Sequence, residues 1–222
     1  MILSAVLLLA SAAHALVHGV DSSTLVPTAT YSKVHSEGFT KAVIRGYQEA
    51  CASGGRVDPN FVPSYNNAKA AGFTNIDTYW LPCNGSGNKC KSYAEQLGEL
   101  QNAIKSNNMQ IGRIWVDIEK DMACNNWNYG QGGNLREARS LTSALRTSGV
   151  QFGIYSSAAE WGGIFGSLGT VVDSSVPLWF ATYDRVEDLH MKTPFGGWTS
   201  AFGKQYSDMS ASGKFNLNVF SS

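Results

Sequence analysis

The chain has 222 residues, a length typical of one large domain or two small ones. Hydrophobic residues make up 43% of it and charged residues only 15%, which excludes disorder as the general state. Lys and Arg together number 17, as do Asp and Glu, so the formal net charge is zero. Because no basic field can attract nucleic acid or an anionic membrane, we expect neither as a partner.

The first 15 residues have the pattern of a secretory signal peptide. An apolar run over 2–13 is broken only by two serines, and Ala13-His14-Ala15 is the small-x-small pattern that precedes a cleavage site. We expect a mature protein of residues 16–222 that is secreted or delivered to a lysosome or phagosome. No other run approaches the roughly 18 apolar residues of a membrane span.

Strand-like and helix-like segments alternate along the mature chain. In chain order the patterns predict strands at 19–22 and 41–47, a helix at 63–71, a strand at 75–81, a helix at 93–106, a strand at 111–119, a helix at 134–148, and strands at 152–156, 178–183, 204–206 and 217–220. This alternation favours a parallel α/β sheet, and about eight strands in this length favour a closed barrel. Because the later connections are short, we predict a single irregular, TIM-like (β/α) barrel with fewer helices than strands.

Cysteines come in an even number in an exported chain, which suggests two disulfides. Among the three possible pairings we favour Cys83–Cys90, because the Gly-rich segment between them closes easily, which leaves Cys51–Cys124. A zinc site is the rival, but no Cys-x-x-Cys occurs and the histidines do not cluster with cysteines, so we expect no metal. The short loop also carries a glycosylation sequon at 84–86, where a glycan could sit.

Two carboxylates end the predicted strand at 111–119. Alternation places Trp115, Asp117 and Glu119 on one face, with the two acids about 6.5–7 Å apart along the backbone. Parallel barrels carry their reactive residues at the C-terminal ends of strands. Like charges this close raise one pKa, which makes a general acid near neutral pH, and we expect Asp117 to be ionised while Glu119 holds its proton. A solvated strand end is the alternative, but the apolar run before the pair argues against it.

Asp21 ends the first predicted strand in a similar way, although such a residue is more often a turn or capping residue. The chain lacks a serine-nucleophile motif, a dinucleotide motif and a P-loop, and we expect no cofactor. Paired carboxylates without metal or cofactor are the usual equipment of a glycoside hydrolase. Aromatic rings near other strand ends suit sugar faces, although core packing must explain at least half of them. These rings are Tyr79, Trp80, Tyr155, Trp179 and Tyr183.

In sequence order, the motifs resemble those of the glycoside hydrolase family 25 lysozymes, the Chalaropsis-type N-acetylmuramidases, and in particular their secreted eukaryotic branch. The matching blocks are G-V-D-S-S (19–23), V-D-P-N-F (57–61), N-A-K-A-A-G (67–72), W-V-D-I-E (115–119), F-G-I-Y-S-S (152–157), L-W-F-A-T-Y (178–183), G-K-Q-Y-S-D (203–208) and N-L-N-V-F (216–220). The resemblance implies a modified (β/α) barrel that hydrolyses the β-1,4 bond between N-acetylmuramic acid and N-acetylglucosamine in bacterial peptidoglycan, for defence or bacterial digestion. We expect the protein to be a monomer.

Residue by residue, the resemblance maps the general acid to Glu119. It maps the group that orients and stabilises the substrate's N-acetyl group to Asp117, and a neighbouring essential acid to Asp21. The candidate substrate-binding residues are Tyr79, Tyr155, Trp179, Tyr183 and Asn216.

Asn216 departs from the family, whose last strand usually carries an aspartate there. The departure favours the alternative that the chain is a catalytically weak or inactive barrel that binds peptidoglycan or chitin. The retention of both Asp117 and Glu119 argues against that alternative. A chitinase is a third reading, but the acid pattern of the common chitinase family is absent, with Arg113 and Trp115 at the positions of its earlier acids.

Overall fold

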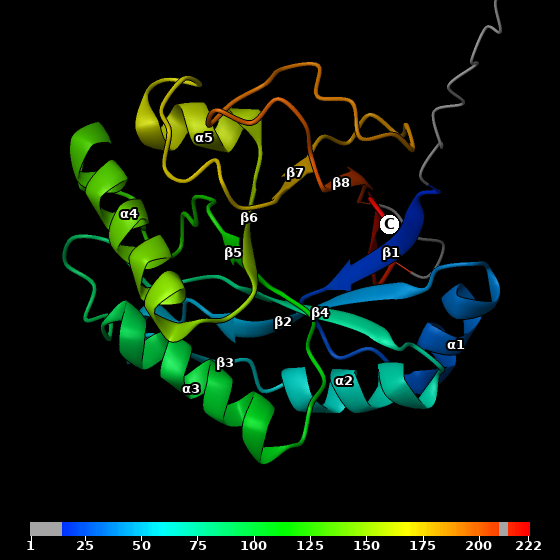
Figure 1. The fold of residues 1–222 in the computed structure, drawn as a ribbon. Coiled ribbons are helices and arrows are strands. Elements are labelled where there is room, and N and C mark those ends of the chain that lie inside the picture. Colours follow the sequence, from blue (N-terminus) through cyan, green and yellow to red (C-terminus); the bar gives the residue numbers. More distant parts are fainter. Residues whose placement is uncertain (1–14, 209–212) are drawn as a thin grey trace, which may run out of the picture.

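Eight strands close into a ring (Figure 1) in the computed structural model, which describes residues 15–208 and 213–222. The order around the ring is β1-β2-β4-β5-β6-β7-β8-β9, and β9 pairs back to β1. All neighbours are parallel except β9, which runs antiparallel to both β8 and β1. The strands are β1 (Val17–Ser22), β2 (Lys41–Gln48), β4 (Asn75–Trp80), β5 (Ile114–Asp117), β6 (Phe152–Ser156), β7 (Leu178–Ala181), β8 (Gly203–Ser207) and β9 (Asn216–Phe220). The short β3 (Arg56–Val57) pairs antiparallel with the last two residues of β2, beyond the part of β2 that pairs with β1.

Helices follow five of the strands and lie outside the ring (Figure 1). They are α1 (Thr28–Ser36), α2 (Phe61–Ala70), α3 (Tyr93–Ser106), α4 (Gln131–Ser148) and α5 (Ala158–Phe165). No described helix follows β7 or β8, so the predicted irregular barrel with fewer helices than strands is confirmed. None of the described helices is long and apolar enough to cross a membrane. The predicted signal peptide lies outside the described residues, apart from Ala15.

Two helices, α1 and α5, were not predicted. The α1 segment buries only Tyr31 and Val34, so its apolar periodicity is weak. The α5 segment contains Gly162 and Gly163, which lower its intrinsic helix propensity. Both helices are therefore stabilised mainly by packing against the barrel, which a local pattern does not reveal.

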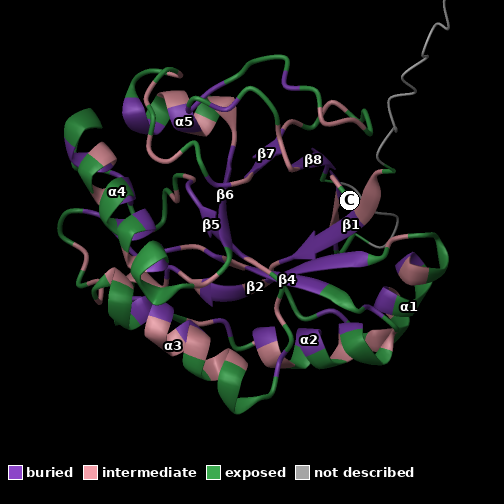
Figure 2. Cartoon of the chain, in the orientation of Figure 1, coloured by how far each residue is buried: buried purple, intermediate pink, exposed green. Residues whose placement is uncertain are grey.

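Strand alternation separates two apolar cores. On β5 and just beyond it, Ile114, Val116 and Ile118 point outward into the large core under the helices. Trp115 points inward and joins the second core inside the ring. The other buried members of that inner core are Val43, Tyr155, Trp179, Ala181 and Phe220. The strands are accordingly buried along most of their length (Figure 2), and the predicted division of β5 into two faces is confirmed.

Glycines make room for the large rings of the inner core. A side-chain carbon at Gly153 on β6 would overlap the Trp115 ring, and one at Gly203 on β8 would overlap the Phe220 ring. The aromatic side chains of this inner core, called the aromatic plug below, can therefore fill the barrel only because Gly153 and Gly203 have no side chains. This plug forms the floor beneath the carboxyl ends of the strands.

On the outer face of β8, which no described helix follows, the side chain of Lys204 is buried. Lys204 is 0% exposed, and its Nζ lies 2.9 Å from Asp184 Oδ1 and 2.8 Å from Asp188 Oδ1. A buried charge is tolerated only when it is paired, so these two contacts hold the segment after β7 against the barrel. Tyr183 lies at the start of that segment.

Both predicted disulfides, Cys83–Cys90 and Cys51–Cys124, are present, and no described cysteine is free. The glycosylation sequon at 84–86 is not in an exposed position, in contrast to what the sequence suggested. Asn84 is 2% exposed and its Oδ1 accepts a hydrogen bond from the Trp127 backbone N–H at 2.8 Å, so the folded loop has no room for a glycan on this side chain.

The two disulfides should differ in their contribution to stability. Cys51 and Cys124 are 73 residues apart and Cys83 and Cys90 only 7, and closing a longer loop restricts the unfolded chain more. We expect replacement of Cys51 and Cys124 by alanine to lower the free energy of unfolding by about 4 kcal/mol, and of Cys83 and Cys90 by about 2 kcal/mol. Urea unfolding of the two double variants measures both values, and an equal or reversed order would contradict this ranking.

Candidate active site

One cavity at the carboxyl ends of the barrel strands collects every residue that the sequence nominated for catalysis or substrate binding. It has a volume of about 130 Å³. Its lining residues are Asp21, Tyr79, Asp117, Glu119, Tyr155, Trp179, Tyr183, Gln205 and Asn216. Of these, Gln205 was not predicted as a site residue. Trp80, the remaining aromatic residue near a strand end, points instead into the outer core and is 0% exposed.

Asp21 is buried at the end of β1 and receives three amide hydrogen bonds. Gln205 Nε2 and Asn218 Nδ2 each donate to its Oδ2 at 2.8 Å, and Asn216 Nδ2 donates to its Oδ1 at 3.1 Å. Burial raises the pKa of Asp21, while these three donors act in the opposite direction. The antiparallel course of β9 supplies two of the three donors, which explains how a buried carboxylate is satisfied here without a cation.

Gln205 connects Asp21 to two tyrosines. Its Oε1 accepts hydrogen bonds from the Tyr155 hydroxyl at 2.9 Å and the Tyr183 hydroxyl at 2.8 Å. Asn218 similarly accepts from Trp179 Nε1 at 2.9 Å while it donates to Asp21. The aromatic rings of the cavity are thus held by the same amides that hold the first acid.

Asp117 and Glu119 form an acid pair in the same cavity. Asp117 is 5% exposed, and burial raises its pKa, with the charge of Glu119 as the next cause. Burial also raises the pKa of Glu119, to about 7, with the charge of Glu160 as the next cause. Two carboxyls within hydrogen-bonding reach of each other titrate as a pair. The hydrogen bond between them raises the pKa of Asp117 and lowers that of Glu119, so the pair keeps a proton near neutral pH. That Glu119 holds this proton while Asp117 is ionised stays a prediction.

Two contacts prepare the pair for a substrate. The Tyr155 hydroxyl donates to Gln205 Oε1 and also lies within hydrogen-bonding reach of Glu119, where this contact opposes the rise in the pKa of Glu119. Asp117 Oδ1 is buried and has no hydrogen-bond partner among the described residues. A buried acceptor without a partner is costly, and a ligand N–H placed there would remove that cost.

Arg45 is a cation whose charge acts on Asp117, and it was not predicted as a site residue. It extends from β2, with Nε donating to Asp58 Oδ2 at 2.6 Å and a terminal nitrogen to the Ser23 carbonyl at 3.0 Å. Its charge opposes the rise in the pKa of Asp117. Sequence alone offered a weak signal, an arginine near the end of a strand, but its partners come from distant loops.

A second hollow, of about 410 Å³, adjoins the first one. Glu119 and Tyr183 line both, so Glu119 lies between two spaces. The second hollow is partly apolar, with Phe180 and Phe195, and its rim carries Glu160 and Lys192. Glu160 Oε2 accepts a hydrogen bond from the Lys120 backbone N–H at 2.9 Å, which fixes a further carboxylate close to Glu119, beyond the end of β5.

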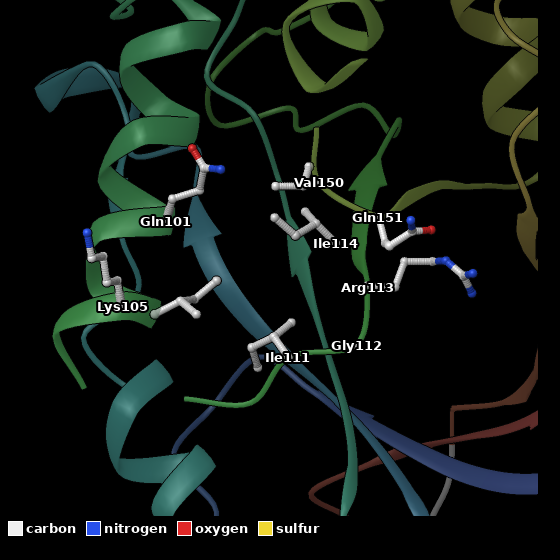
Figure 3. Close-up of a pocket in the computed structure, with 9 residues that line it drawn as sticks. Gln101, Lys105, Ile111, Gly112, Arg113, Ile114, Val150 and Gln151 are labelled. Carbon is white, nitrogen blue, oxygen red and sulfur yellow. The ribbon is translucent and has the colours of Figure 1, made fainter. Parts of the chain in front are cut away.

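A cavity of similar size opens at the other end of the barrel (Figure 3). Its walls come from α3 and from the segments that precede β5 and β6, with Ile104, Ile111 and Val150 as apolar members and Arg113 beside them. None of the acids of the first cavity lines it. We place the chemistry in the first cavity because it combines Asp117 and Glu119 with aromatic rings, whereas no carboxylate lines the cavity at the other end.

Comparison with known proteins agrees with this geometry. Residues 12–206 match the family model described as "Lysozyme-like protein 1". The chain is 35% identical to "Probable GH family 25 lysozyme 4" of Dictyostelium discoideum, over 86% of this chain and 83% of that protein. It is 34% identical to "Lysozyme-like protein 5" of Caenorhabditis elegans, over 91% and 89% of the two chains. The fold is similar to that of a muramidase from Acremonium alcalophilum, with a TM-score of 0.70, 19% identity and coverage of 93% and 94%.

Proposed function

The chain belongs to the glycoside hydrolase family 25 lysozymes, and on that premise we propose that it is an active muramidase of bacterial peptidoglycan. The bond cleaved is the β-1,4 linkage between N-acetylmuramic acid and N-acetylglucosamine. The observation that carries this proposal is the coupled pair Asp117 and Glu119 in an aromatic cavity, with Glu119 near its titration point at neutral pH. Such an acid can donate a proton at the pH where the protein works.

In the proposed mechanism, Glu119 donates its proton to the glycosidic oxygen as the C1–O bond breaks. With the shared proton on Glu119, Asp117 is ionised, and its free Oδ1 accepts the N–H of the substrate's 2-acetamido group. That hydrogen bond orients the acetamido oxygen toward C1, where it forms the new bond of an oxazolinium intermediate. Glu119, now a carboxylate, removes a proton from the water that opens this intermediate, so the configuration at C1 is retained.

Asp21 acts on this site through its charge. It faces amides rather than Glu119, and its charge raises the pKa of both Asp117 and Glu119. Its negative charge also favours the positive charge that develops on the sugar ring in the transition state. The hollows on either side of Glu119 give room for sugars on both sides of the cleaved bond.

The alternative of an inactive sugar-binding barrel gained its support from Asn216. In the structure the Asn216 amide donates to Asp21, so it completes the hydrogen bonding of an acid rather than leaving a gap in the site. The acid pair itself is intact. This arrangement favours catalysis over simple binding.

We also propose, from the N-terminal pattern, that the chain enters the secretory pathway and acts outside the cell or in a lysosome or phagosome. The two disulfides suit such an oxidising route. Defence against bacteria or their digestion would be the biological role, and the protein would act as a monomer.

The first test combines product identity with removal of the acid. Digestion of purified peptidoglycan, followed by borohydride reduction and mass spectrometry, should show N-acetylmuramic acid at the new reducing ends. Glu119→Gln keeps the shape of the side chain but cannot donate the proton, and we expect turnover to fall by at least about 10²-fold with binding retained. Glu37→Gln, at an exposed position on the C-terminal end of α1, is the matched control. New N-acetylglucosamine ends, or near wild-type lysis by Glu119→Gln, would overturn the assignment.

A second prediction concerns the pH dependence of turnover. The reaction needs the proton on Glu119, so activity should fall as the pH rises through the pKa of about 7. Asn216→Asp adds a negative charge beside Asp21 in the same cavity, and a like charge holds that proton more tightly. We expect the alkaline limb of the pH–rate profile to move upward. Asp117→Asn removes a like charge, so the limb should move downward and turnover should also fall.

The profiles are measured on soluble peptidoglycan fragments at constant ionic strength. Asn107→Asp, which adds the same charge at an exposed helix end, controls for the change in net charge. A downward shift for Asn216→Asp, or equal shifts for Asn216→Asp and Asn107→Asp, would show that position 216 does not act on the acid pair.

A further inference from the structure

Glu49 is a buried acid that the mechanism does not use. It follows the end of β2 and is 2% exposed. Its Oε2 accepts a hydrogen bond from Asn126 Nδ2 at 3.3 Å, while its Oε1 is buried without a hydrogen-bond partner among the described residues. No ion pair of the described part of the chain includes it. A carboxylate in such a place is strongly disfavoured, whereas a neutral carboxylic acid is tolerated.

Its surroundings make ionisation still less favourable. The carboxylate oxygens of Glu49 and Asp121 and the Cys124 sulfur all lie within 4.8 Å of one another. Cys124 is in a disulfide and does not titrate. The other groups that face Glu49 are neutral, namely the Asn126 amide and the Asn84 backbone N–H. Burial raises the pKa of Glu49 to about 8, with the charge of Asp121 as the next cause.

Asn126 connects this buried acid to the catalytic strand. It is 5% exposed, and its Nδ2 also donates to the Glu119 backbone carbonyl at 3.0 Å. Its Oδ1 accepts from the Asp121 backbone N–H at 2.7 Å. The Asn126 side chain therefore spans the turn that begins at Glu119, and Glu49 lies directly behind it.

We propose that Glu49 is a positioning residue for the catalytic acid: held as a neutral carboxylic acid, it fixes Asn126, and Asn126 fixes the backbone of Glu119. This role rests on the proposed muramidase function. A proton on Glu49 removes its repulsion of Asp121, so both side chains can stay beside Asn126. Loss of that proton would force the two carboxylates apart and release the turn that carries Glu119.

Two variants separate the neutral acid from its charged form. Glu49→Gln keeps the shape and the acceptor for Asn126 but cannot ionise, and Glu49→Ala removes both. At pH 6 we expect kcat to fall by at least about 10-fold in Glu49→Ala, with a smaller change in KM, because a small displacement of a catalytic group has a large effect on turnover. Glu49→Gln should restore kcat to near the wild-type value, and Glu37→Gln serves as the exposed control.

Thermal stability tests the protonation state directly. In the folded protein Glu49 ionises near pH 8, but in the unfolded chain near its ordinary value of 4.5, so wild-type stability falls as the pH rises between those values. The stability of Glu49→Gln does not fall for this reason, because glutamine cannot ionise. The Tm of Glu49→Gln minus that of the wild type should therefore increase from about pH 4.5 to about pH 8 and then stay constant.

Hydrogen exchange provides a readout that does not depend on activity. The Asp121 N–H donates to Asn126, so peptides covering 118–126 should exchange at least about 10-fold faster in Glu49→Ala and at the wild-type rate in Glu49→Gln. If Glu49→Gln is as impaired as Glu49→Ala in kcat and exchange, or if its Tm difference does not change with pH, Glu49 does not act as a neutral acid and the proposal fails. An inactive wild type with the expected Tm and exchange patterns would instead contradict the muramidase function.

Discussion

The site depends on two carboxyls that are buried together at the mouth of the barrel. Asp117 and Glu119 lie on the same face of β5 and its extension, and burial together with neighbouring negative charge raises the pKa of both. Fully ionised, the pair would be two buried negative charges, with the charge of Arg45 acting on Asp117. A proton kept by the pair near neutral pH avoids that cost, and in the proposed mechanism this proton is delivered to the leaving oxygen.

The strands around the acid pair determine its electrostatic surroundings. Asp21 contributes a third negative charge, but three amide donors, from β8 and β9, satisfy it without neutralising it. The antiparallel insertion of β9 between β8 and β1 is what brings two of these donors to the end of β1. Beneath them, the buried side chains around Trp115 fill the inside of the barrel.

Local patterns predicted a large part of this arrangement. The period-two alternation around 114–119 predicted which side chains lie on each face of β5. A shift of the strand by one residue would turn its apolar side chains away from the helices, so the buried outer face fixes the register. The disulfide pairing followed from the short loop between Cys83 and Cys90. The strand predicted at 111–119 is shorter, Ile114–Asp117, and the Ile118 N–H still bonds to the Tyr155 carbonyl at 2.9 Å, so Glu119 keeps its inward direction beyond the strand end.

What the sequence did not reveal depends on contacts between distant segments. Gln205 and Asn218 are 184 and 197 residues from Asp21, and nothing near them in sequence marks them as its donors. The same holds for Glu49, whose partner Asn126 is 77 residues away. Burial of Asn84 beneath Trp127 also required the folded loop, since the sequon alone suggested an exposed asparagine.

The most direct test of the shared proton is a carbon-13 NMR titration of the Glu119 side-chain carboxyl in the wild type and in Asp117→Asn. We expect Glu119 in the wild type to titrate near pH 7, with a second step that follows Asp117, and to titrate at lower pH as a single step in the variant. A single wild-type step near the ordinary glutamate value of 4.5, unchanged in Asp117→Asn, would show that the two carboxyls do not share a proton and would contradict the account of the site.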